Sequence, residues 1–200
     1  MNKKPAAILF DMDGVLVDSL DSWWQALNNA MKTYAKIEIG RDEFIEKYWG
    51  HDLRDNLKKA RLNPEIANFC NTIYGNHIDA VRLYPDTKPT LQALSHYKKG
   101  IITNTPRGCA QQILRRFDIE RYFQVIVTSD EVEQGKPDPE IVFKACNLFN
   151  VNPQDVLIVG DTASDIKAGK AAGCTVVGLN IEADFVIHRL SELPAMILSE

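Results

Sequence analysis

Short runs of apolar, mostly β-branched residues recur along the chain, and segments with helical spacing separate them. The first run, 6–10, reads Ala-Ala-Ile-Leu-Phe and shows no alternation of polar and apolar residues. A run of this kind is typical of a strand that is buried on both faces of a parallel sheet. Residues 185–187 are a candidate sixth strand, and four runs of the same character lie at 99–103, 124–128, 156–160 and 175–179.

Helical segments are expected between these runs, at about 86–97, 106–117, 139–149 and 164–172. Strands and helices that alternate at this spacing favour an α/β fold, with a Rossmann-like, doubly wound parallel sheet covered on both faces. Residues 18–82 differ, because they read as four helices and no strand, at about 20–35, 42–48, 52–60 and 64–83. We therefore expect a core formed by residues 1–17 and 83–200, with an all-helical cap, residues 18–82, inserted after the first strand.

Polar residues mark several of the expected helix starts. Ser22 and Gln25 have the spacing of a capping box. Asn63 precedes a proline that suits the first position of a helix. Thr105 is expected to cap the helix that follows it, and Asp18 is expected to cap the first helix of the insertion.

Composition and charge exclude several classes of function. The 200 residues are 45% hydrophobic and carry a formal net charge of −4, so the chain lacks the basic surface that nucleic-acid binding requires. No apolar run is long enough to cross a membrane, and the polar residues 1–5 do not resemble a signal peptide. The four cysteines are widely spaced, which is typical of reduced residues. We expect a cytoplasmic protein that contacts neither nucleic acid nor membrane.

Two aspartates, Asp11 and Asp13, follow the first apolar run with one residue between them. In an extended backbone both side chains point to the same side, and Gly14 permits a sharp turn directly after them. Two like charges this close repel each other unless they share a cation or a proton. Solvated acids at a strand end are the ordinary alternative, but the later parts of the chain favour a site for a metal ion and a phosphate group.

Further polar groups fall at or just after the ends of later strands. Thr103 and Asn104 close one strand, Asp161 and Asp165 follow another, and Lys136 lies in a Gly-Lys-Pro sequence before a helix. In doubly wound sheets, ligands bind in the crevice beyond the carboxyl ends of the strands. The sequence therefore predicts that the two aspartates lie in this crevice, beneath the cap, with these groups at neighbouring strand ends.

At these residues the chain resembles the haloacid dehalogenase-like superfamily of phosphohydrolases over its whole length. The stretch 11–19 (Asp-Met-Asp-Gly-Val-Leu-Val-Asp-Ser) is similar to the first motif of the superfamily, and Thr103 is similar to the second. Residues 135–137 (Gly-Lys-Pro) and 160–165 (Gly-Asp-Thr-Ala-Ser-Asp) are similar to the third and fourth motifs. The helical insertion resembles the cap of phosphoglycolate phosphatases and their close relatives.

The resemblance implies a phosphatase that transfers a phosphoryl group to Asp11 and then hydrolyses the aspartyl phosphate. Asp13 would be the general acid and base, Thr103 a hydroxyl donor and Lys136 a positive charge on the phosphate. The implied cofactor is Mg²⁺, held by the carboxylates of Asp11 and Asp161 and by the backbone carbonyl of Asp13. A divalent ion would remove the repulsion between a carboxylate and a phosphate dianion.

Further candidates surround this site. Asp165 is expected to orient the lysine or a metal-bound water, or else only to favour the N-terminus of its helix. Arg54 and Asn104 are candidate substrate-binding residues. A guanidinium suits a remote carboxylate or a second phosphate, although Arg54 could equally be an exposed helix residue. One of Trp23 and Trp24 could line the substrate gap, with packing in the core of the cap as the alternative.

The implied substrate is a small phosphorylated metabolite, phosphoglycolate being one candidate, and the protein would be a monomer or a homodimer. The same motifs leave open a phosphomutase of the β-phosphoglucomutase type and an inorganic pyrophosphatase. A non-catalytic phospho-acceptor like a receiver domain is a further alternative, but the helical insertion and Asp13 argue against it. A haloacid dehalogenase would leave Asp13 unexplained.

Overall fold

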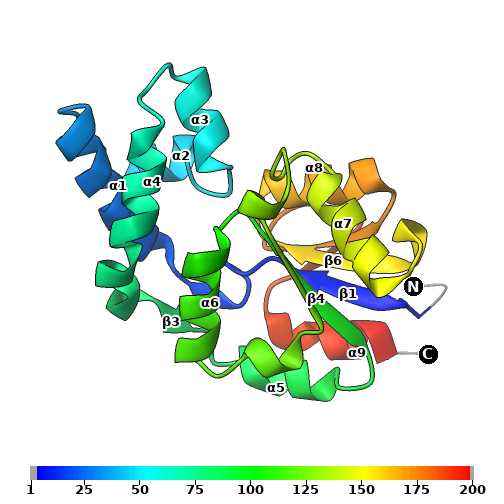
Figure 1. The fold of residues 1–200 in the computed structure, drawn as a ribbon. Coiled ribbons are helices and arrows are strands. Elements are labelled where there is room, and N and C mark those ends of the chain that lie inside the picture. Colours follow the sequence, from blue (N-terminus) through cyan, green and yellow to red (C-terminus); the bar gives the residue numbers. More distant parts are fainter. Residues whose placement is uncertain (1–3, 199–200) are drawn as a thin grey trace.

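The core of the protein is a six-stranded parallel sheet. The computed structural model describes residues 4–198, and Figure 1 shows the sheet beside a separate group of helices. The strands run in the order β5-β4-β1-β6-β7-β8, and every neighbouring pair is parallel. Their bounds are β1 (Ala7–Phe10), β4 (Lys98–Thr103), β5 (Val125–Thr128), β6 (Val156–Gly160), β7 (Thr175–Leu179) and β8 (Phe185–Ile187). The predicted doubly wound α/β fold is confirmed, together with its sixth strand.

β1 shows why the predicted strands are apolar without alternation. All of its residues are fully buried, Ile8 and Phe10 in the core on one face of the sheet and Leu9 in the core on the other. The first face is covered by α5 (Thr87–Ala93), α6 (Arg107–Arg116) and α9 (Leu193–Leu198), and the second by α7 (Glu140–Phe149) and α8 (Ala163–Ala172). Figure 1 shows α7 and α8 on the side of the sheet opposite α5 and α9. None of the helices within residues 4–198 has the length and apolar character that crossing a membrane requires.

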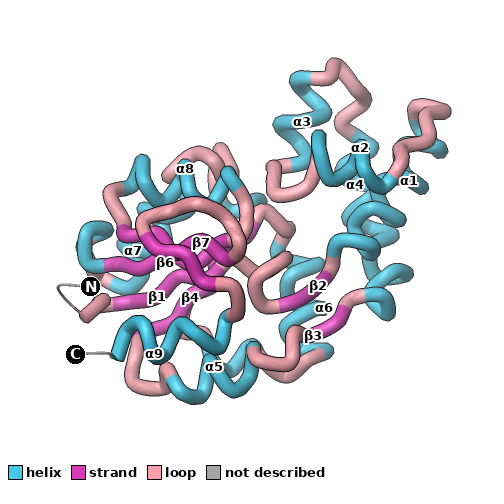
Figure 2. Tube along the Cα trace, turned by 180° about the vertical axis from the view of Figure 1, so that it is seen from behind, coloured by secondary structure: helices cyan, strands magenta, loops and turns pink. Residues whose placement is uncertain are grey.

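A group of helices is inserted between two short strands. β2 (Val17–Asp18) and β3 (Arg82–Leu83) pair in antiparallel fashion, so the chain leaves and re-enters the core at adjacent points, as Figure 2 shows from behind. The helical insert, residues 20–80, contains α1 (Leu20–Tyr34), α2 (Arg41–Lys47), α3 (Leu53–Lys59), α4 (Glu65–Ile73) and a 3-10 helix (Tyr74–Ala80). The helix predicted over 64–83 is thus α-helical only in its first half.

Side-chain contacts explain why some helix starts differ from the predictions. α1 begins two residues before Ser22, and the Oγ of Ser22 donates a hydrogen bond to the carbonyl of His77 at 2.8 Å. The predicted capping box at Ser22 is therefore wrong. Asp18 lies in β2 and does not cap α1, so that prediction is wrong as well. α4 begins at Glu65 and Pro64 takes the cap position, one residue later than predicted, although the side chain of Asn63 accepts a hydrogen bond of 2.9 Å from the backbone N–H of Glu65.

Gly169 allows α8 to pack closely on the sheet. A Cβ at this position would lie 2.6 Å from Cγ2 of Val176 in β7 and 3.1 Å from Cδ1 of Ile158 in β6. A Cβ at Gly108, which is exposed in the first turn of α6, would meet no described atom within 4 Å.

We expect Gly169→Ala to lower the free energy of unfolding by about 1–3 kcal/mol, because the added methyl group overpacks the helix against the sheet. The matched variant Gly108→Ala should leave the free energy of unfolding unchanged or raise it by up to about 1 kcal/mol, because alanine has the higher helix propensity. Urea unfolding of both variants measures the difference. Equal stability of the two would contradict the close packing of α8.

Candidate active site

The carboxyl ends of three neighbouring strands bring the predicted site residues together. β1 pairs with β4 and β6 in a register that aligns Phe10 with Ile101 and with Val159. The residues after β1 and β6 and the end of β4 therefore lie at one edge of the sheet. A cavity of about 350 Å³ lies there, and its lining from the core includes Asp11, Asp13, Thr103, Asn104 and Lys136.

Lys136 is a buried cation in this site. Its Nζ lies 2.9 Å from Oδ1 of Asp11, 2.6 Å from Oδ1 of Asp165 and 3.1 Å from the carbonyl oxygen of Ile102. Only 2% of its side chain is exposed. Burial by itself would lower the pKa of Lys136, but Asp11 and Asp165 together raise it above its usual value. The ammonium group therefore stays charged.

The acids around this lysine outnumber it. Burial raises the pKa of Asp11 well above its usual value, and repulsion from Asp165 adds to the effect while Lys136 opposes it. Burial, followed by repulsion from Asp165, raises the pKa of Asp161 to about 7. Asp11, Asp161 and Asp165 each offer a carboxylate oxygen, and these atoms lie within 4.8 Å of one another. One lysine cannot balance three carboxylates, so the cluster favours a further cation.

The carboxylate of Asp161 fits the role of a metal ligand. Its Oδ1 is buried and has no hydrogen-bond partner among the described residues, which is unusual for a buried oxygen. Gly14 leaves the space that this side chain fills, because a Cβ there would lie 2.0 Å from Oδ2 of Asp161. Gly14 also has a φ of +85°, which other residues rarely adopt. Since carboxylate oxygens are preferred ligands of hard divalent cations, the cluster could hold such an ion.

Asp165 combines the two roles that the sequence left as alternatives. One oxygen holds the ammonium group of Lys136, and the other accepts hydrogen bonds from the N–H of Thr162 at 3.0 Å and from its Oγ1 at 2.6 Å. Thr162 and Asp165 thereby form the capping box of α8. Both oxygens of Asp165 are occupied, so Asp161 is better placed than Asp165 to bind a metal ion.

Asp13 is held by four donors from two parts of the fold. Its Oδ1 accepts hydrogen bonds from Oγ of Ser19 and from Nε1 of Trp23, the latter at 3.3 Å. Its Oδ2 accepts hydrogen bonds from Oγ1 of Thr105 at 2.7 Å and from Oγ1 of Thr103 at 3.2 Å. The first pair comes from the start of α1 and the second from the end of β4. The side chain of Asp13 therefore lies where the helical insert meets the core.

Thr105, Ser19 and Trp23 are contacts of Asp13 that the sequence reasoning missed or left undecided. Thr105 was expected to cap a helix, but α6 begins at Arg107 and the Thr105 hydroxyl donates to Asp13 instead, so the cap prediction is wrong. Its spacing from Thr103 was the available signal, because residues two apart on an extended chain face the same side. Trp23 lines the cavity, whereas Trp24 donates to the carbonyl of Ile39 inside the insert.

Asn104 lines the cavity, but its amide group is bonded to the backbone. Oδ1 accepts a hydrogen bond of 2.8 Å from the N–H of Lys136, and Nδ2 donates to the carbonyl of Lys136 at 2.9 Å and to that of Gly50 at 3.2 Å. Gly135 leaves room for this contact, since a Cβ there would lie 2.6 Å from Oδ1 of Asn104. These contacts fix the loop that carries the lysine and join it to the helical insert.

Arg54 also lines the cavity, at the side formed by the helical insert. Its Nη2 lies 2.8 Å from Oδ2 of Asp52 and donates a hydrogen bond of 2.6 Å to the carbonyl of Ser129 in the core. Asp52 is buried and also caps α3 with its side chain. The positive charge of Arg54 is therefore compensated within the protein.

Comparison with known proteins agrees with this arrangement. The family model for haloacid dehalogenase-like hydrolases matches residues 8–179. A phosphoglycolate phosphatase of Photorhabdus laumondii is 32% identical over 189 residues, which cover 86% of this chain and 79% of that protein. The pyrophosphatase PpaX of Bacillus cereus is 28% identical over 202 residues, 93% of each chain.

A solved structure extends the similarity to the whole fold. The crystal structure of a predicted phosphoglycolate phosphatase from Haemophilus somnus has a TM-score of 0.81 and 26% sequence identity, and the match covers 98% of this chain and 99% of that chain. The chain thus belongs to the haloacid dehalogenase-like hydrolase family and is a phosphatase.

Proposed function

We propose that the protein is a Mg²⁺-dependent phosphatase that hydrolyses a small organic phosphomonoester through an aspartyl phosphate on Asp11. The state of Asp11 is the observation that carries this proposal. Its Oδ1 is held by Nζ of Lys136 at 2.9 Å and by the N–H of Met12 at 2.7 Å, while Oδ2 accepts no hydrogen bond from residues 4–198. A fixed carboxylate with one unengaged oxygen, lining a cavity, is suited to nucleophilic attack.

Asp11, Asp161 and the backbone carbonyl of Asp13 are the proposed Mg²⁺ ligands. The unpartnered Oδ1 of Asp161 and the excess of acids around Lys136 support this assignment. When bound, the ion supplies positive charge that offsets the repulsion between Asp11 and a phosphate dianion. Asp165 keeps Lys136 in position rather than joining the ligands.

The protein's own side chains account for the remaining requirements of the reaction. Asp11 attacks phosphorus, and Lys136 and the hydroxyl of Thr103 stabilise the charge on the phosphoryl oxygens. Asp13 gives a proton to the leaving oxygen and later accepts one from the attacking water. Ser19, Thr103 and Thr105 suit both states of this acid, because a hydroxyl can turn from donor to acceptor when the carboxylate becomes protonated.

We further propose that residues 18–82 act as a cap over this site. Three contacts join the insert to loops of the core: Asn104 to Gly50, Arg54 to Ser129 and His51 to Ser164, the last between Nδ1 and Oγ at 3.3 Å. In this closed arrangement the insert forms one wall of the cavity. Excluding bulk water from the phosphoryl group would protect its transfer to Asp11.

Pyrophosphatase activity is the second candidate, because a relative from Bacillus cereus carries that name. A panel of 2-phosphoglycolate, pyrophosphate and glucose 1-phosphate separates the alternatives. Free phosphate from an ester supports the proposed function, and preferential cleavage of pyrophosphate supports the second candidate. Glucose 6-phosphate as the product would indicate a phosphomutase. A stable phosphoryl group on Asp11 without turnover would indicate a phospho-acceptor.

Asp11→Asn is expected to reduce Mg²⁺-dependent phosphate release by a factor on the order of 10⁴ or more, because the amide cannot act as the nucleophile. The matched control is Asp21→Asn, since Asp21 is an exposed acid that pairs with Arg41 on the helical insert. The control should retain wild-type activity. Steady-state phosphate release measures both variants. Substantial turnover by Asp11→Asn would rule out the aspartyl phosphate.

Mg²⁺ should stabilise the protein more at pH 8 than at pH 5.5. Burial and Asp165 raise the pKa of Asp161 to about 7, so a proton competes with the ion below that pH. Without Mg²⁺, the folded state holds this proton more tightly than the unfolded chain does, and its stability falls as the pH rises from about 4 to 7. Bound Mg²⁺ removes that penalty, so it should raise the Tm by several degrees at pH 8.

Asp161→Asn provides the control for this pH dependence, because the amide side chain carries no charge and does not titrate. Scanning calorimetry at the two pH values, with and without Mg²⁺, measures the effect. The variant should lose most of the Mg²⁺-induced shift at pH 8. A shift in the wild type that is the same at both pH values would contradict the assignment of Asp161.

A further inference from the structure

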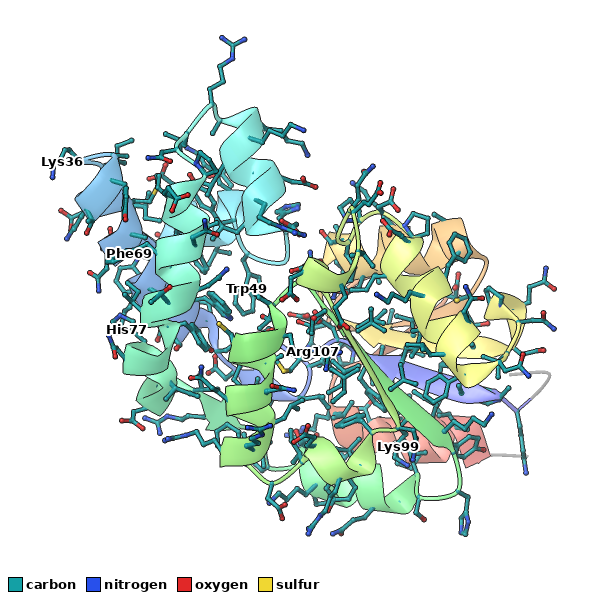
Figure 3. The ribbon with its side chains drawn as sticks, viewed as in Figure 1. Lys36, Trp49, Phe69, His77, Lys99 and Arg107 are labelled. Carbon is teal, nitrogen blue, oxygen red and sulfur yellow. The ribbon has the colours of Figure 1, made fainter. Side chains whose placement is uncertain are left out.

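The helical insert gives the cavity a wall of aromatic side chains. Trp23, Phe44, Tyr48 and Trp49 line the cavity on this side, and Figure 3 shows Trp49 on the side of the insert that faces the core. The rings support one another. Phe44 lies 6.4 Å from Tyr48 and 6.1 Å from Trp49 between ring centroids, and Trp23 stacks on Tyr74 at 4.0 Å. The wall is therefore packed before any substrate arrives.

Two polar groups in this wall have no hydrogen-bond partner within residues 4–198. The hydroxyl of Tyr48 and the indole N–H of Trp49 make no hydrogen bond to any described residue, although both side chains are half-buried. Aromatic faces with a few open polar groups suit a ring-bearing molecule, which can stack and still form a hydrogen bond.

Each fixed cation that lines the cavity in the described chain is already paired with an acid. Arg54 and Lys136 are the fixed cations among the lining residues of the described chain, and each is paired with a buried aspartate. Burial, followed by the nearby Lys59 and Lys167, lowers the pKa of His51 and so favours the neutral form of its ring. A carboxylate placed here would lose water and would compete with the buried Asp52 for the guanidinium of Arg54.

The size of the cavity limits the substrate as well. Its volume of about 350 Å³ lies near the lower end of the range of roughly 300–1,000 Å³ for small-molecule sites. In the proposed function, the phosphate group and its Mg²⁺ ion would lie at the end of the cavity that Asp11 lines. The rest of the cavity adjoins the aromatic wall, and the leaving group of the substrate would lie there.

We propose that the site selects phosphomonoesters whose alcohol carries an uncharged aromatic ring, and that it discriminates against small anionic esters such as 2-phosphoglycolate. This inference rests on the proposed phosphatase function and specifies its substrate class. The ring gains by leaving water and packing on Trp49 and its neighbours. The carboxylate of 2-phosphoglycolate would instead lie near Arg54, whose charge is already paired with Asp52.

The direct test compares kcat/KM for benzyl phosphate, ethyl phosphate and 2-phosphoglycolate with the full-length protein and Mg²⁺. The first has a neutral ring, the second is neutral without a ring, and the third is small and anionic. We expect benzyl phosphate to exceed each of the others by at least about tenfold, the discrimination that an apolar pocket commonly provides.

Two variants test the ring and the charge separately. Trp49→Leu should reduce kcat/KM for benzyl phosphate by about tenfold and change that for ethyl phosphate little. The matched control is Phe143→Leu, which alters an exposed aromatic residue of α7 outside the cavity and should change neither value. Asp52→Asn keeps a side-chain cap for α3 but frees the charge of Arg54. It should raise kcat/KM for 2-phosphoglycolate relative to benzyl phosphate by about tenfold.

The outcomes separate this inference from the proposed function. If none of the three esters releases phosphate, the phosphatase proposal itself fails. If 2-phosphoglycolate is hydrolysed at least as well as benzyl phosphate, the phosphatase stands and the proposed selectivity is overturned. An equal loss on all three esters in Trp49→Leu, with intact folding by circular dichroism, would overturn the ring contact. No shift in preference in Asp52→Asn would overturn the charge argument.

Discussion

The arrangement of the site depends on one buried ammonium group that is shared by carboxylates from separate segments. Nζ of Lys136 joins Asp11 after β1 to Asp165 in α8, and it also bonds the backbone at the end of β4. Burying an ion pair of this kind carries a high desolvation cost. Its main effect is therefore to hold charged groups in the site, and its contribution to the stability of the fold is small. Because the acids outnumber the lysine, the cluster combines a carboxylate held in a fixed position with a place for a cation.

Two residues connect this charged cluster to the helical insert. Asn104 bonds the backbone of the lysine loop and the carbonyl of Gly50, so the same amide touches both parts of the fold. Asp13 draws donors from α1 and from the end of β4. Movement of the insert would therefore change the surroundings of the proposed acid and base at the same time as it opens the cavity.

Much of the fold could be predicted from the sequence, because burial on both faces of a parallel sheet leaves a clear pattern. The run over β1 contains no polar residue, and each of its side chains is fully buried. The glycines and aspartates after the strands could be placed for the same reason. The residues at which helices begin were harder to predict. Ser22 has the right spacing for a capping box, but its hydroxyl donates a hydrogen bond to the carbonyl of His77, 55 residues away.

The candidate site was predictable where each residue sits in a local motif and obscure where partners come from distant segments. Asp11 and Asp161 could be placed at strand ends from the local sequence, whereas Lys136 and Asp165 were grouped with them through motifs that resemble those of the superfamily. The hydroxyl of Thr105 was harder to assign, because its spacing from Thr103 shows only that both face the same side of the chain and not that Asp13 lies 2.7 Å away. Arg54 looked like a free guanidinium, because its pairing with Asp52 and Ser129 depends on how the insert folds onto the core.

The most direct test of the central claim is a crystal structure of the protein soaked with Mn²⁺ as a substitute for Mg²⁺, with anomalous scattering to locate the ion. The account predicts one ion bound by a carboxylate oxygen of Asp11, by Oδ1 of Asp161 and by the backbone carbonyl of Asp13, with Lys136 still on Asp11. An ion bound elsewhere, or the absence of an ion at saturating Mn²⁺ and pH 8, would contradict it.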